Sequence, residues 1–140
     1  MIEKPMKYIS IDGVDYPYKC TIGVLEMIQE KYVDVLLFED GIMGRVPVLD
    51  DDGMRVTDKA MFTVPKVDMV CTGLELMIKA GIKLTGSELE PVAAEYFKDQ
   101  DEYTLNELAQ IVFEEYTRSF FSKNRKKATV SRKSRSRSKN

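Results

Sequence analysis

Apolar and polar residues alternate with a period of two most clearly near the start of the sequence. The stretch MKYISIDGVDYPYKC (6–20) contains two β-prone runs separated by Asp12-Gly13. Asp-Gly readily takes the positive φ angles of a two-residue type I′ turn, so the pattern predicts a β-hairpin here. Pro17 has no N–H to give to a neighbouring strand, so we expect the second strand to be an edge strand or to be only partly paired.

Apolar residues repeat at spacings of three and four in the next regular stretches, which is typical of amphipathic helices. Thr21 offers an N-cap oxygen to a helix over residues 22–32. A longer helix is expected from Pro65, a residue favoured at the first helical position, to Gly81 as the C′ residue. The predicted apolar faces are Ile22, Leu25, Ile28 and Tyr32 in the first helix, and Val67, Val70, Cys71, Leu74, Met77 and Ile78 in the second.

Two further helices are predicted closer to the C-terminus. A short one lies within residues 87–98 and begins either at a capping box of Ser87 and Glu90 or at Pro91. A longer one begins with the capping-box signature TLNE (104–107). Its main apolar stripe is Leu105, Leu108, Val112, Tyr116 and Phe120, while Ile111, Phe113 and Phe121 lie off that stripe. This helix is therefore wrapped on more than one side, or it leaves part of its apolar surface for a partner.

Residues 33–62 are the least regular part of the chain. The stretch VDVLLFEDG (33–41) is compatible with a strand or with a helix, and its periodicity does not decide between them. The stretch RVPVLDDDGMRV (45–56) is compatible with a second short hairpin that turns around residues 50–53.

Together these elements predict the α+β class, with one or two N-terminal β-hairpins packed against a small bundle of about four helices. Residues 1–122 suit a single domain with one core, since 44% of the whole chain is hydrophobic. The longest apolar runs, such as VDVLLF (33–38), are far shorter than the roughly 20 residues of a membrane span. The start MIEKPMKYIS does not read as a secretory signal, so we expect a soluble protein without a membrane partner.

The two cysteines, Cys20 and Cys71, are far apart in the sequence, and Cys71 falls on a predicted apolar helix face. Free Cys is among the most buried residue types, and disulfides are rare in reducing compartments. We therefore expect two reduced, buried thiols in a cytosolic protein rather than a disulfide.

Residues 123–140 differ sharply from the rest in charge. They hold nine of the 21 Lys and Arg and no acidic residue, while residues 1–122 keep 12 basic and 23 acidic residues, a net charge of −11. Such a tail buries too little apolar surface to offset roughly 1 to 2 kcal/mol of backbone entropy per residue, so it is predicted to be disordered. The basic residues that could bind a polyanion are Lys123, Arg125, Lys126, Lys127, Arg132, Lys133, Arg135, Arg137 and Lys139.

Nucleic acid is one partner that this tail suggests. The alternation of Arg and Ser in SRKSRSRS resembles Arg/Ser-rich segments that bind RNA through charge. The tail has no aromatic residue to stack on bases, and the acidic remainder of the chain repels phosphate backbones. The alternatives are a solvated extension and a contact with an acidic protein surface.

The sequence offers little for catalysis. It has no His, the commonest general base and zinc ligand, and it has no P-loop, dinucleotide or nucleophile-elbow pattern. Aligning the aspartates of 50–52 with an EF-hand loop puts Val48 and Lys59 at the two anchoring positions, so a solvated turn is preferred. Glu114 and Glu115 are adjacent on a helix and are expected to be charged helix surface. We expect no enzyme activity, cofactor or metal.

The layout of the elements resembles that of a known family. The carrying stretches are YISIDGVDYPYKCTIGVLEMIQEKY (8–32), VDMVCTGLELMIKAGIKL (67–84), which closes on Ala-Gly, and TLNELAQIVFEEYTRSF (104–120). They are similar to the N-terminal hairpin and helix, the central helix and the C-terminal helix of tail assembly chaperones of long-tailed, siphovirus-type bacteriophages that infect Gram-positive hosts. The resemblance is one of pattern and layout within residues 6–121, and residues 33–62 and the basic tail depart from it.

The resemblance implies a small, non-enzymatic α+β protein of the host cytoplasm. It would bind the tape-measure protein and the tail-tube protein during tail assembly and be absent from the mature virion. Many such chaperones also exist in a longer, frameshifted form, and Lys126-Lys127 is where a run of adenines could permit slippage.

A helical client requires exposed apolar helix surface on such a chaperone. We assign this surface to Ile111, Phe113, Tyr116, Phe120 and Phe121, the alternative being that Ile111, Phe113 and Phe121 fill a second core layer. Self-association as a homo-oligomer stays open. So do two other function classes: a nucleic-acid-associated protein acting through its tail, and a structural tail-completion or head–tail joining protein.

Overall fold

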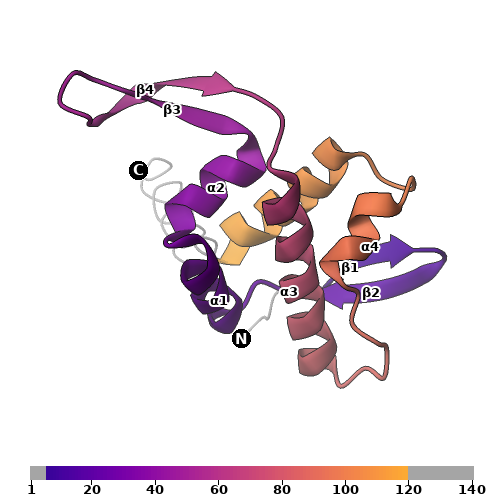
Figure 1. Ribbon diagram of the computed structural model, residues 1–140. Coiled ribbons are helices and arrows are strands. Elements are labelled where there is room, and N and C mark those ends of the chain that lie inside the picture. Colours follow the sequence, from indigo (N-terminus) through magenta and orange to yellow (C-terminus); the bar gives the residue numbers. More distant parts are fainter. Residues whose placement is uncertain (1–5, 120–140) are drawn as a thin grey trace, which may run out of the picture.

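The structure, a computed structural model, describes residues 6–119, apart from the side chains of residues 57–60. In this range the chain is α+β, as predicted, with two small antiparallel sheets and five helices (Figure 1). The strands are β1 (Lys7–Ile11), β2 (Val14–Tyr18), β3 (Arg45–Leu49) and β4 (Arg55–Phe62). The helices are α1 (Ile22–Tyr32), α2 (Val35–Met43), α3 (Val67–Thr85), α4 (Ala94–Asp99) and a further helix described over residues 105–119. The predicted domain boundary at residue 122 and the predicted disordered tail lie outside the described residues.

The first hairpin, β1–β2, is the one that Asp12-Gly13 predicts. Asp12 and Gly13 have φ angles of 51° and 80°, both positive as a type I′ turn requires. β2 contains Pro17 and pairs with β1 alone, so its other edge is outside the ladder, as expected. That side of the hairpin packs on α3, where the N–H of Lys19 donates to the carbonyl oxygen of Met77 at 2.9 Å.

The end of α3 corrects the prediction for Gly81. The helix begins at Val67, two residues after Pro65, and runs past Gly81 to Gly86, whose φ of 67° makes it the C-cap. Gly81 is buried inside the helix where β2 crosses, and a Cβ there would lie 2.4 Å from the carbonyl oxygen of Pro17. Glycine is therefore needed for the close approach of a strand and not for helix termination.

α1 and α2 both begin with a side-chain N-cap. Thr21 Oγ1 accepts the N–H of Val24 at 3.1 Å, as predicted, and Asp34 Oδ1 accepts the N–H of Leu37 at 2.8 Å. The buried face of α1 includes Val24, whereas Ile22, expected on that face, is 85% exposed. Helical side chains lean toward the N-terminus, so the side chain of the first helical residue leans past the end of the helix into solvent.

The irregular segment 33–62 consists of α2 and the second hairpin, β3–β4. The sharp turn expected around residues 50–53 is present, and it is a solvated turn as preferred. Asp50 Oδ1 accepts the backbone N–H groups of Asp52 and Met54, each at 2.9 Å. The three aspartates follow the last residue of β3 and are exposed to solvent. Figure 1 shows this hairpin above α2, with its tip extending away from the other helices. Among the described elements, helix α2 is the one helix beyond the four that the sequence predicts, because the periodicity of residues 33–41 did not decide between a strand and a helix.

The two C-terminal helices differ in how well their starts were predicted. α4 begins later than both expected starts, because Ser87 makes a local turn rather than a capping box with Glu90, and Pro91 precedes the helix. The second capping box is confirmed: Thr104 Oγ1 accepts the N–H of Glu107 at 3.1 Å, and Glu107 Oε1 accepts the N–H of Thr104 at 2.9 Å.

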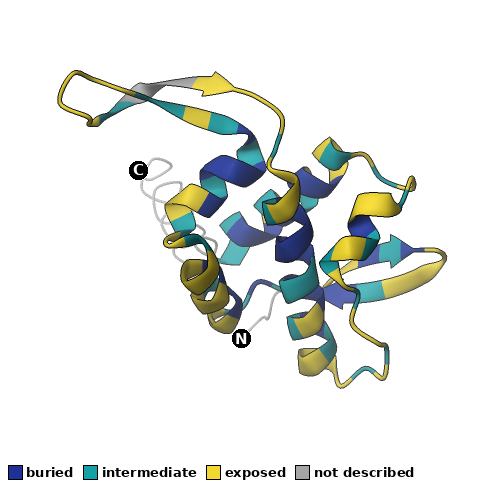
Figure 2. Cartoon of the chain, viewed as in Figure 1, coloured by how far each residue is buried: buried dark blue, intermediate teal, exposed yellow. Residues whose placement is uncertain are grey.

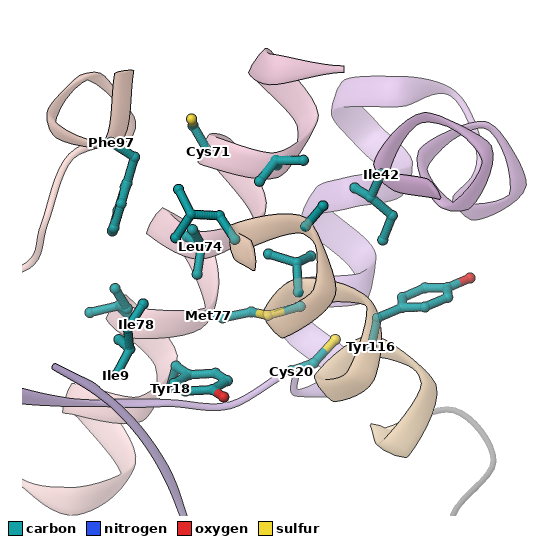
Figure 3. Packing of buried hydrophobic residues seen from close by; sticks show 14 of the residues in the cluster. Ile9, Tyr18, Cys20, Ile42, Cys71, Leu74, Met77, Ile78, Phe97 and Tyr116 are labelled. Carbon is teal, nitrogen blue, oxygen red and sulfur yellow. The ribbon is translucent and has the colours of Figure 1, made fainter. Parts of the chain in front are cut away.

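The core surrounds α3, which packs on β2 and on the other labelled helices (Figure 3). Its members on α3 are the predicted stripe apart from the exposed Val67: Val70, Cys71, Leu74, Met77 and Ile78. Cys20 and Cys71 are both buried and free, as expected. Burial raises the pKa of the Cys20 thiol to about 12, so this thiol stays protonated and unreactive at neutral pH.

Candidate interaction surfaces

The apolar residues expected to meet a partner on helix 105–119 turn toward the core wherever the structure describes them. Tyr116 is 2% exposed and is a core residue, so its side chain is not available to a partner in this fold. Ile111 and Phe113 are half-buried and pack against the core, as the alternative of a second core layer requires. Phe120 and Phe121 lie outside the described residues. A partner-binding role for Ile111 and Phe113 stays a prediction.

The nine basic residues of the tail also lie outside the described residues, as does Lys126-Lys127. Polyanion binding by this segment therefore stays a prediction from composition alone.

Glu115 was expected on a charged helix surface, and the structure corrects this. Its side chain is buried, while its neighbour Glu114 is exposed as expected. Glu115 Oε2 accepts the backbone N–H of Cys20 at 3.0 Å, and Oε1 lies 2.8 Å from Nη2 of Arg118. A buried carboxylate needs such partners, because an unpaired charge in the interior is strongly unfavourable. Glu115 therefore has a structural role, linking helix 105–119 to the start of α1.

A second buried carboxylate anchors the β3–β4 hairpin. Asp40 on α2 is 5% exposed; its Oδ2 lies 2.7 Å from Nη2 of Arg55, and its Oδ1 lies 3.3 Å from Nε of Arg45. Arg45 also pairs with Glu39 at 3.4 Å, and Glu39 accepts the hydroxyl of Tyr116 at 3.1 Å. Both strands are thereby fixed to α2, and α2 is fixed to helix 105–119.

The link between α1 and α2 contains a strained residue. Val33 has φ 75° and ψ −53°, and the N–H of Asp34 donates to the carbonyl oxygen of Tyr32 at 2.8 Å. This is the rare γ-turn with positive φ at its centre. A positive φ is unusual for a β-branched residue and costs on the order of 1 to 3 kcal/mol, and such strain is often found at functional sites.

The two sides of this strained link are held firmly. The hydroxyl of Tyr32 donates to Oδ2 of Asp68 on α3 at 2.6 Å, and burial together with this hydrogen bond raises the pKa of Tyr32 to about 12. On the other side, Phe38 of α2 is fully buried, and its ring centroid lies 5.9 Å from that of Tyr32. The turn is thus set between two anchored aromatic residues.

Three aliphatic side chains are exposed at and beside this turn. Val33 is 80% exposed, Leu36 49% and Leu37 48%. Single exposed apolar residues are ordinary on a protein surface. Here three of them fall within a span of five residues that begins at a strained, anchored turn, so they form a cluster. Figure 2 shows the exposed positions along α1 and at the start of α2. We call Val33, Leu36 and Leu37 the α1–α2 corner.

A second set of exposed apolar side chains lies on the β3–β4 hairpin. Its members are Val46, Leu49, Met54, Met61 and Phe62, of which Phe62 is the most exposed at 73%. Both surfaces fall in residues 33–62. The periodicity of this segment did not decide between helix and strand, so the sequence analysis did not predict these surfaces. The available signal was Asp34, a good N-cap residue immediately before an apolar run.

Comparisons with protein-family descriptions, with curated proteins and with solved structures found no match to this chain. Within residues 6–119, no helix combines the length and apolar character that a membrane crossing requires.

Proposed function

We propose that this protein is a non-enzymatic tail assembly chaperone of a long-tailed bacteriophage. It binds the tape-measure protein and the tail-tube protein in the host cytoplasm and is absent from the mature virion. The order of hairpin, central helix and C-terminal helix supports the proposal, because these stretches resemble that family. The single structural observation that carries it is the α1–α2 corner, an exposed aliphatic cluster on an anchored, strained turn.

The corner is suited to an apolar stripe on a helical client. Each aliphatic side chain that a client covers contributes on the order of 1 to 2 kcal/mol, so the three exposed residues of the corner give a modest affinity. Modest affinity at each contact suits an assembly factor that binds a long client repeatedly and then leaves it. The anchors at Tyr32 and Phe38 keep the cluster in place before binding, which limits the entropy lost on association.

The proposal is tested by co-expressing the tagged protein with the tape-measure and tail-tube proteins encoded in the same genome. We expect both to copurify with the wild-type chain and to be lost from the Leu36→Ser/Leu37→Ser variant. Leu84→Ser is the matched control, because Leu84 is similarly exposed at 58% but lies near the end of α3. Failure of the wild-type chain to retain either protein would contradict the proposal, as would the absence of a neighbouring tape-measure gene.

A separate comparison addresses nucleic acid. RNA and DNA binding by the full chain and by a chain that ends at Ser122 are measured at two salt concentrations. Equal weak binding by both chains would eliminate a role for the basic tail, whereas salt-dependent binding by the full chain alone would support it.

A further inference from the structure

The outward face of α1 carries two carboxylates between two apolar ends. Ile22, Glu26 and Glu30 are spaced four residues apart, so they lie along one face of the helix, and all three are exposed. Val33 follows at the end of the helix and is 80% exposed, while Ile22 at the other end is 85% exposed. We call these four residues the α1 stripe; Figure 2 shows the exposed positions along this helix. The stripe is roughly 16 Å long, at about 1.5 Å of rise per residue.

The negative charge of the α1 stripe is not compensated within residues 6–119. Neither Glu26 nor Glu30 forms an ion pair with a described residue. The neighbouring Lys31 instead places its Nζ 5.6 Å from the centroid of the Tyr32 ring. At its far end the stripe runs into the exposed aliphatic side chains of the α1–α2 corner. The face therefore combines apolar ends with unpaired carboxylates in the middle.

The last described helix ends beside the start of α1. Glu115 accepts the backbone N–H of Cys20 at 3.0 Å, and Ser119, the last described residue, makes a side-chain hydrogen bond with Cys20. Ile22 lies only two residues after Cys20. Residues 120–140 therefore leave the described part of the chain next to the first residue of the α1 stripe.

The first part of that segment, FFSKNRKKATV (120–130), has the complementary order of residues. Phe120 is apolar, the basic residues Lys123 and Lys127 follow, and Val130 is apolar again. Their spacings of three, four and three put all four on one face of a helix. On a helix this face is roughly 15 Å long, which matches the length of the α1 stripe.

We propose that residues 120–130 dock as a helix along the α1 stripe of the same chain and cover the α1–α2 corner. The facing pairs are Phe120 with Ile22, Lys123 with Glu26, Lys127 with Glu30, and Val130 with Val33. The segment starts at one end of its own binding face, so its effective concentration there is high and a weak contact is sufficient. A helix that forms only on contact with α1 agrees with the disorder predicted for the free tail.

The docked segment regulates client binding at the α1–α2 corner, because a client must displace it. Solvent-exposed ion pairs are individually weak, so the docked state is only a few times more populated than the open state. A client that binds only the open state therefore binds about three- to tenfold more weakly than it would without docking. This consequence rests on the proposed function, whereas the docking itself does not.

The docking is tested by disulfide trapping in the full chain without a client. In Glu30→Cys/Lys127→Cys the two new cysteines replace a facing pair, and the native cysteines are buried. We expect mild oxidation to give mostly a monomer with an internal disulfide. The matched control is Glu88→Cys/Lys127→Cys, whose first cysteine is exposed beyond the end of α3 and is nearer in sequence to residue 127. An absence of the internal disulfide from the test variant, or equal trapping in the control, would overturn the proposal.

A second measurement uses charge reversal and a client. Lys123→Glu/Lys127→Glu should bind a tape-measure segment about three- to tenfold more tightly than the wild-type chain. Adding Glu26→Lys/Glu30→Lys to the same chain should restore the wild-type Kd, because the facing charges are again opposite. Arg135→Glu/Arg137→Glu is the control with the same change of charge outside the docked segment, and it should leave the Kd unchanged.

The two proposals fail in different ways in these experiments. A client that binds the wild-type chain and Lys123→Glu/Lys127→Glu with the same Kd would overturn the regulation by docking and leave the chaperone function intact. If none of these chains binds any segment, the proposed function fails, and the disulfide trapping alone decides whether residues 120–130 dock on α1.

Discussion

The carboxylate of Glu115 accepts the backbone N–H of Cys20 at 3.0 Å, across 95 residues of sequence. Cys20 lies between β2 and α1, and Glu115 lies on helix 105–119, so one hydrogen bond joins the first hairpin and the first helix to the last helix described. The same carboxylate pairs with Arg118. The junction of three elements therefore depends on one buried charge.

Replacement of Glu115 by Ala should lower the free energy of unfolding by about 3 kcal/mol, because it leaves the Cys20 N–H and the guanidinium of Arg118 without their shared acceptor. Urea unfolding followed by circular dichroism measures the change. Glu114→Ala is the matched control on the exposed side of the same helix and should change stability by less than about 0.5 kcal/mol. Equal effects of the two substitutions would show that the buried contact contributes nothing.

Two glycine substitutions within helices should change stability in opposite directions. Gly81→Ala places a Cβ 2.4 Å from the carbonyl oxygen of Pro17, so β2 must move away from α3, and we expect a loss of at least about 2 kcal/mol. Gly23→Ala meets only Thr21 Oγ1 at an ordinary 3.6 Å and should stabilise by about 0.5 to 1 kcal/mol through helix propensity. Thermal unfolding of both variants distinguishes them, and a stable Gly81→Ala variant would contradict the close strand–helix packing.

Val33→Gly should relieve the strain of the γ-turn. Glycine accepts a φ of 75° without steric penalty, and this gain exceeds the extra chain entropy of glycine, so we expect a net stabilisation of about 1 kcal/mol. Client binding should weaken at the same time, because the most exposed side chain of the α1–α2 corner is removed. A variant that is less stable than the wild-type chain would argue against strain at this turn.

Alkaline pH should destabilise the fold before lysines titrate fully. The pKa of Cys20 is raised from 9.0 to about 12 by burial, and that of Tyr32 from 10.0 to about 12 by burial and Asp68. The folded state thus retains protons that the unfolded chain releases. Their contribution to stability is complete below about pH 9 and is lost as the pH rises toward 12. Urea unfolding at pH 8 and at about pH 10.5 should differ by about 2 kcal/mol from Cys20 alone, and Cys20→Ala should remove that part.

Local signals predicted much of the fold. Asp12-Gly13, the Thr21 cap and the capping box of Thr104 and Glu107 act within a few residues, so the sequence contains all the information that fixes them. Gly81 was misassigned because its requirement comes from a strand that is distant in sequence.

The candidate surfaces could not be predicted, because exposure is a tertiary property. Helix 105–119 has apolar residues on more than one side, and only the packing shows that Tyr116 is buried. Glu115 has the pattern of a surface residue, and its burial depends on partners that fold around it. Conversely, Val33 and Leu37 lie in an apolar run that suggests core, yet both are exposed in the fold.

The central claim, that the α1–α2 corner binds an apolar helical client, is tested most directly by titration calorimetry. Purified segments of the tape-measure protein are titrated into the wild-type chain, into Leu36→Ser/Leu37→Ser and into the control Leu84→Ser. We predict that at least one segment binds the wild-type chain and the control with the same Kd, and binds the corner variant at least about tenfold more weakly. Equal affinity for all three chains, with the corner variant fully folded, would contradict the claim.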